Sequence, residues 1–140
     1  MDGKVGRICF YRLLEGEDLL IGIQERVIQS GMKSGFFMTI GALSSAVFGL
    51  YHAGQYKEIK ADGPLEIAAC MGDVAVNEAS EVVVHAHLVV SNEKGEASGG
   101  HLMKGCAIDP TAELIVIEAL DISLVRAYDE KTKLNLLKLT

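Results

Sequence analysis

Residues 82–105 constrain the fold more than any other stretch of the chain. They hold three of the four histidines, two runs of valine, a turn signal and a double glycine. The β-branched residues at 82–84 and 89–90 predict a strand. Because side chains alternate across a strand, His85 and His87 share one face. The opposite, apolar face is made by Val82, Val84, Ala86, Leu88 and Val90.

A hairpin loop follows this strand. The three residues Glu-Lys-Gly that end at Gly95 suit a three-residue loop with the glycine in the left-handed conformation. Such a loop pairs Asn92 with Glu96. Counting back along both strands places His87 opposite His101, with Cβ atoms about 4.5–5.5 Å apart.

The hairpin therefore predicts a cluster of His85, His87 and His101. Three neutral imidazoles suit Zn²⁺ or another divalent transition metal. The alternative interpretation is that these histidines pack in a subunit interface with their nitrogens hydrogen-bonded. A register slip, or a bulge at Gly99 and Gly100, would send His101 to the opposite face.

The remaining elements predict a single α+β domain over residues 1–140, with a largely antiparallel sheet and one main N-terminal helix. The helix spans residues 18–30, where apolar residues recur at helical spacing before Gly31. Breaks are expected at residues 41–45, at Gly63 and Pro64, at Gly72, and at Asp109 and Pro110. The other expected strands are 5–14, 36–43, 46–51, 56–60, 65–76, 112–119, 122–128 and 135–139.

The apolar content of the chain bears on assembly. Hydrophobic residues make up 49% of the 140 residues, and the mean hydropathy is +0.27. No apolar run is long enough to span a membrane. We therefore expect the surplus apolar surface to be buried between copies of the chain in a homo-oligomer.

The charge of the chain disfavours nucleic acid as a direct partner. Thirteen basic and nineteen acidic residues give a formal net charge of −6. Nucleic-acid binding depends on basic phosphate contacts, and pairs such as Lys57 with Lys60 and Lys131 with Lys133 are sparse. DNA binding by this chain alone is therefore not expected.

The cysteines and the first residues indicate the compartment. Cys9, Cys70 and Cys106 are odd in number and far apart, so they are interpreted as small buried hydrophobes rather than disulfide or metal partners. Residues 1–10 lack the apolar core of a signal peptide. We expect a cytoplasmic protein.

His85-Ala86-His87 followed by Gly99-Gly100-His101-Leu102 resembles the signature of the PPC ("plants and prokaryotes conserved") domain. The resemblance covers nearly the whole chain and includes further elements in the family's order. These are Arg12 with residues 15–18, residues 41–46, Tyr56, Gly63, residues 65–67, Glu113, and Arg126 with Asp129.

The resemblance implies an α+β fold, assembly into a trimer, and metal at the matching histidines in some members. The plant proteins carry AT-hooks that bind DNA, but this sequence has no Arg-Gly-Arg-Pro core. Pro64 and Leu65 also stand where the plant proteins have the arginine and phenylalanine of a partner-binding stretch. The sequence thus resembles a stand-alone, prokaryotic-type member.

Three functional hypotheses follow. The leading one is a trimeric binding or regulatory module with a metal at the three histidines, and it names no catalytic residue. The second is a metal-dependent hydrolase in which Glu66 or Glu113 is the general base. The third is a DNA-associated regulator, suggested by the resemblance alone.

Other polar residues are assigned structural roles. Interface ion pairs with Arg12 or Arg126 are the favoured interpretation of Glu66 and Glu113. His52 is interpreted as a surface residue at a strand end. Residues 41–45 lack the spacing of a phosphate loop. No nucleophile-elbow pattern surrounds the serines at positions 44, 45 and 98.

Overall fold

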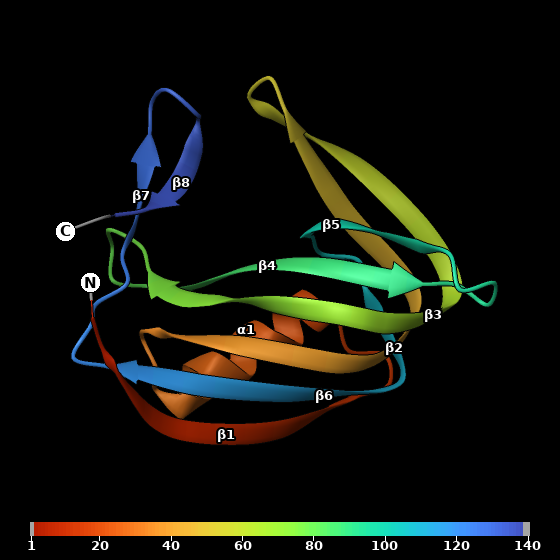
Figure 1. Ribbon diagram of the computed structural model, residues 1–140, viewed down its shortest axis with the longest axis horizontal. Coiled ribbons are helices and arrows are strands. Elements are labelled where there is room, and N and C mark those ends of the chain that lie inside the picture. The colour runs from red at the N-terminus through yellow and green to blue at the C-terminus, as the bar shows by residue number, and fades with distance from the viewer. Residues whose placement is uncertain (1, 139–140) are drawn as a thin grey trace.

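The computed structural model describes residues 2–138 and shows one helix packed against a six-stranded antiparallel sheet (Figure 1). The strand order is β1-β6-β2-β3-β4-β5, and β7 and β8 form a separate two-stranded sheet. The α+β prediction is confirmed. The elements are β1 Lys4–Leu14, α1 Leu19–Ser30, β2 Gly35–His52, β3 Gln55–Val76, β4 Val82–Ser91, β5 Ala97–Leu102, β6 Ala107–Leu120, β7 Arg126–Asp129 and β8 Leu134–Leu137.

The helix has the predicted boundaries. The Asp18 side chain caps its start by accepting a hydrogen bond from the Ile21 backbone N–H at 3.1 Å. Gly31 ends it in the left-handed conformation, with φ of 73°. Leu19 and Val27 are among the residues that bury the apolar stripe of α1 against the sheet.

The sheet has one covered face and one open face. Figure 1 shows α1 lying against one face, where alternate side chains such as Phe37 and Leu114 are fully buried. The other face carries large apolar side chains that remain exposed, including Phe10 (73%), Ile40 (60%) and Met71 (58%). We call this the open face.

The β4–β5 hairpin has the predicted register. His87 pairs with His101, and the ladder continues without a shift to the pair of Ser91 and Ala97. Gly95 has a φ of 74°, in the left-handed region that the three-residue loop requires. No bulge occurs at the glycine pair, so all three histidines stay on one face.

The predicted turn at Gly63 and Pro64 is wrong. β3 continues through both residues, and they form a bulge because Leu43 pairs with Leu65 while Ser45 pairs with Asp62. The bulge leaves Pro64, which has no N–H, outside the ladder. The break predicted at residues 41–45 is likewise a register shift inside a continuous β2.

Two further predicted breaks are wrong for similar reasons. Gly72 does not interrupt β3, because it pairs with both Phe37 and Ala86. β6 runs through Asp109 and Pro110, which lie in a register shift against β2. The strand expected at 122–128 starts only at residue 126, and position 139 of the last expected strand lies outside the described residues.

Beyond the bulge, β2 and β3 continue as a long hairpin, whose base still pairs with β5 through Phe48 and Gly49. We call residues 46–61 the arm; it projects from the body of the molecule (Figure 1). The Tyr51 hydroxyl near its tip donates a hydrogen bond to the carbonyl of Thr132, between β7 and β8. The arm and the β7–β8 hairpin are therefore in contact.

Candidate metal centre

The three predicted histidines converge. His85 and His87 project from β4, and His101 comes from β5 through the register described above. One nitrogen from each ring lies within 4.8 Å of the other two. Nitrogens around a tetrahedral zinc ion are about 3.3 Å apart for bonds of ~2.0–2.1 Å, so modest side-chain rotations would bring the set to ligand distance.

His101 is the best-prepared ligand of the three. Its Nδ1 is buried and has no hydrogen-bond partner among the described residues. Burial, together with repulsion from His85, His87 and Arg126, lowers the pKa of His101 to about 4. The ring is therefore neutral at pH 7, as metal binding requires. A metal ion would supply the partner that Nδ1 lacks, so the donor set fits a metal.

Asp73 and Arg126 lie next to the Nδ1 atom of His85. Asp73 pairs with His85 across β3 and β4, and its Oδ2 lies 3.7 Å from His85 Nδ1. Arg126 Nη2 lies 2.6 Å from Asp73 Oδ2 and 3.0 Å from His85 Nδ1. Burial favours a higher pKa for Asp73, but its contacts with His85 and Arg126 outweigh burial and lower it.

Asp73 was not predicted as a site residue, although it stands opposite His85 on the neighbouring strand. Arg126 was expected in interface ion pairs with Glu66 or Glu113, and the structure pairs it with Asp73 instead. The signal for this contact was weak, because 53 positions separate the two residues in sequence.

The other candidate residues lie away from the histidines. Glu66 pairs with Ser91, four residues beyond His87 on β4, or about 13 Å along the strand. Glu113 lies on β6, and β2 and β3 separate that strand from β4. His52 is exposed at the end of β2, as predicted. Within one chain, neither glutamate therefore lies beside the histidines.

The glycine pair allows β5 to sit close to its neighbours. A Cβ at Gly99 would collide with the carbonyl of Leu88, and one at Gly100 would lie 2.6 Å from the carbonyl of Gly49. The absence of side chains at these two positions therefore permits this close packing. It places His101 between β4 and β2, with its ring centroid 4.8 Å from that of Tyr56 on the arm.

The cysteines behave as predicted hydrophobes. Cys9, Cys70 and Cys106 are free thiols, and the last two are buried. Burial raises the pKa of Cys70 to about 12 and that of Cys106 to about 11. These thiols therefore stay protonated at neutral pH and are not prepared to bind a metal.

Two hollows flank the histidines. A cavity of about 350 Å³ lies between His85, His101, the arm residue Tyr56 and the β7–β8 hairpin. A shallower groove of about 570 Å³ on the open face is lined by His85, His87 and apolar side chains such as Met71.

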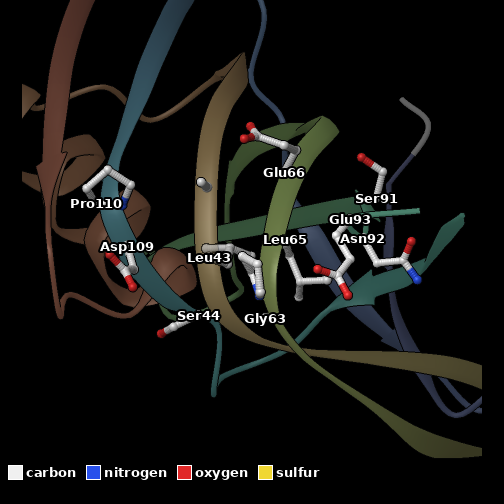
Figure 2. A pocket seen from close by; sticks show the side chains of 12 residues that line it. Leu43, Ser44, Gly63, Leu65, Glu66, Ser91, Asn92, Glu93, Asp109 and Pro110 are labelled. Carbon is white, nitrogen blue, oxygen red and sulfur yellow. The ribbon is translucent and has the colours of Figure 1, made fainter. Parts of the chain in front are cut away.

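A third cavity, of about 580 Å³, lies at the other end of the sheet and contains none of the histidines. Figure 2 shows Glu66, Glu93 and Asp109 around it, on three different segments. No lysine or arginine lines it among the described residues. We assign it no ligand.

Within residues 2–138, the structure contains no helix with the length and hydropathy needed to cross a membrane.

The solved structures that are similar to this chain include the following three. A metal-containing protein of Archaeoglobus fulgidus is 31% identical, with a TM-score of 0.88 over 99% of this chain and 97% of that one. A plant- and prokaryote-conserved protein of Pyrococcus horikoshii is 28% identical, with a TM-score of 0.90 over 99% and 96%. A candidate DNA-binding protein of Ralstonia eutropha is 26% identical, with a TM-score of 0.81 over 94% and 90%.

Sequence comparison gives two further results. A family model described as the Plants and Prokaryotes Conserved (PCC) domain matches residues 1–120. The bifunctional protein GlmU of a Synechococcus strain is 33% identical over 127 residues, which are 90% of this chain and 19% of that protein. The chain thus spans about a fifth of the length of this curated relative.

Proposed function

The chain belongs to the Plants and Prokaryotes Conserved domain family, and from that premise we propose that it is a metal-binding module. In this proposal His85, His87 and His101 hold Zn²⁺ or another divalent transition metal. The observation that carries it is the buried, unpartnered Nδ1 of His101 beside two further imidazoles. The Archaeoglobus fulgidus neighbour, described as metal-containing, supports it.

The surrounding residues have defined tasks in this proposal. Contact with Arg126 and Asp73 occupies the Nδ1 side of His85, which leaves Nε2 as its ligand atom. A histidine that binds metal through Nε2 carries its proton on Nδ1. Metal binding would therefore turn Arg126 Nη2 away from His85 Nδ1 and leave Asp73, whose Oδ2 is 3.7 Å from Nδ1, as an acceptor for that proton. A divalent ion held by three imidazoles keeps a fourth position for water or a ligand.

Binding fits the site better than hydrolysis does. Both carboxylate oxygens of Asp73 are engaged by Arg126, at 3.2 and 2.6 Å. The two predicted general bases lie away from the histidines. Glu66 is opposite Ser91, four residues beyond His87 on β4, and Glu113 is on β6, which β2 and β3 separate from β4. Among the described residues, the cluster of potential ligand atoms at this site consists of the three histidines and includes no carboxylate.

The proposed assembly is a homotrimer. Exposed apolar side chains such as Phe10, Ile40 and Met71 make the open face unsuitable for long contact with water. Covering this face with neighbouring copies of the chain removes that surface from solvent. The trimer implied by the family resemblance is the arrangement that we adopt.

Elemental analysis of protein purified without a tag or added metal tests the metal site. We expect about one zinc or similar ion per chain, and its loss in His87→Ala and His101→Ala. His52→Ala is the matched control, because it removes an imidazole outside the cluster, and it should retain the metal. Metal-free wild-type protein that also takes up no added Zn²⁺ would refute the proposal.

DNA binding is a second candidate, and the Ralstonia eutropha neighbour is the observation that favours it. The net charge of −6 opposes it. A mobility-shift titration against AT-rich duplex at two salt concentrations separates the two functions. Salt-sensitive binding at micromolar protein would support the DNA role, and its absence would exclude direct binding.

A further inference from the structure

The cavity beside His101 has walls from three parts of the chain. Its floor is His85 and His101, one wall is Tyr56 on the arm, and the other is the β7–β8 hairpin. The hydrogen bond from Tyr51 to Thr132 joins the two walls. With a volume of about 350 Å³, the cavity lies within the usual range for small-molecule sites, about 300–1,000 Å³.

The single formal charge on the cavity lining is positive. Arg126 is the only lysine, arginine, aspartate or glutamate that lines it among the described residues. Four of its five N–H groups face Asp73, His85 and the carbonyl of Asn135. One N–H on Nη1 has no protein acceptor within residues 2–138, so it is available to a ligand.

Two acceptors that a cationic ligand could use, the Asp73 carboxylate and the Asn77 side-chain carbonyl, are already engaged. Arg126 engages both oxygens of Asp73. Asn77, which also lines the cavity, accepts backbone hydrogen bonds from Ala79 and Glu81 through its Oδ1. A metal ion at the histidines would add further positive charge. The head group that suits this end of the cavity is therefore an anion.

The rest of the lining is apolar. Val83 and Val84 lie on the β4 side, and Leu134 and Leu136 lie on the β7–β8 side. The Tyr56 ring lines the third side, with its centroid 4.8 Å from that of His101 and its plane tilted by 31°. A ligand with a short hydrocarbon tail would bury that tail against these groups.

The groove on the open face is a weaker site for such a ligand. Its lining includes Phe36, Met38 and Met71, which belong to the face that neighbouring copies would cover in the trimer. The cavity beside the β7–β8 hairpin shares none of these three residues.

We infer that this cavity binds a small organic anion, a short-chain monocarboxylate, with the carboxylate toward the histidines and Arg126 and the tail toward Leu134 and Leu136. The assignment rests on the proposed function, because a metal at the histidines would supply most of the positive charge.

Calorimetric titration of zinc-loaded protein with three probes tests the assignment. The probes are 3-methylbutanoate, the neutral isostere 3-methylbutanamide, and acetate, which has the head group without the tail. The acid should bind at least about tenfold more tightly than either of the others, since both charge and tail contribute.

Leu134→Asp and Leu136→Asp place a negative charge on the apolar wall and should each weaken binding of the acid at least about tenfold, with zinc content unchanged. Leu136 is 41% exposed, so its variant should fold even if the Leu134 variant does not. Leu120→Asp, at an exposed leucine outside the cavity, is the matched control and should bind normally.

The outcomes separate the two proposals. Protein that takes up no zinc refutes the proposed function. Zinc-loaded protein that binds acid and amide equally, or that is insensitive to both leucine variants, overturns the cavity assignment and leaves the metal site standing.

Discussion

The two faces of the six-stranded sheet are built from the same strands but differ in what covers them. On the covered face, α1 buries side chains such as Phe37 completely. On the open face, the adjacent Phe36 is 46% exposed, and the histidine cluster lies farther along the same surface. A step of one residue along a strand therefore separates a position in the folding core from one on the open face.

This difference teaches that stability and function are carried by alternate residues of one strand. In β4, Ala86 and Leu88 belong to the core, while His85 and His87 face away from it. Changes on the open face should therefore alter assembly or metal binding without unfolding the chain, and changes on the covered face should do the reverse.

The largest expected effect is on assembly. Ile40→Asp places a carboxylate in the proposed subunit interface of every copy, and burial of an unpaired charge costs several kcal/mol at each site. We expect the trimer to dissociate in sedimentation analysis. Ile28→Asp, at an equally exposed isoleucine on α1, is the control and should remain trimeric. If Ile40→Asp and Ile28→Asp had the same oligomeric state, the proposed interface would be contradicted.

The next effect is on the core. Phe37→Ala should lower the free energy of unfolding by about 3–5 kcal/mol, since it leaves a cavity at a fully buried position. Phe36→Ala, one residue away on the open face, should cost less than about 1 kcal/mol at protein concentrations low enough for dissociated chains. Urea unfolding measures the free energy of unfolding of both variants. An equal decrease in Phe37→Ala and Phe36→Ala would contradict the distinction between the faces.

A smaller effect is expected at Asp73, which lies beside the histidines on the open face. Asp73→Asn keeps the shape but removes the acceptor charge for His85, so zinc affinity should fall about 10- to 100-fold. Competition with a chromogenic chelator measures this. Asp109→Asn, at the opposite end of the sheet, is the control. Unchanged affinity in Asp73→Asn would show that the carboxylate does not support the metal ligand.

The last expected effect is on the pH dependence of metal-free protein, where the change at any single pH step is small. The pKa of His101 is lowered to about 4 in the folded state, against about 6.5 in an unfolded chain. Between these values the unfolded state binds more protons, so stability falls as pH drops from about 6.5 toward 4. The slope is at most about 1.4 kcal/mol per pH unit. His101→Gln should flatten this profile in urea unfolding, and an unchanged profile would contradict it.

The histidine cluster could be predicted because its geometry is local. A three-residue loop ending at Gly95 is enough to set the register that brings His87 opposite His101. The bulge at Gly63 and Pro64 could not be predicted, because the same two residues also suit a turn. Only the pairing of β3 with β2 distinguishes the two structures, and that pairing is not encoded in the dipeptide itself.

The contact between Asp73 and Arg126 was beyond prediction for a related reason. It depends on the return of the chain from β6 to the end of β3, where Val76 and Val125 form an isolated bridge. The sequence alone marks Arg126 as a residue of interest through the family resemblance. It contains no local pattern that names the partner.

The continuity of β2 and β3 has a mechanical consequence. Each is one continuous strand that begins in the part of the sheet packed against α1 and extends to the tip of the arm. The arm is therefore a cantilever, fixed at its base in the core and free at its tip. In a cantilever, a small rotation at the fixed base produces a larger displacement at the free end. Softening of the packing around Phe48 would therefore appear first as a displaced Tyr56, well before the sheet itself melts.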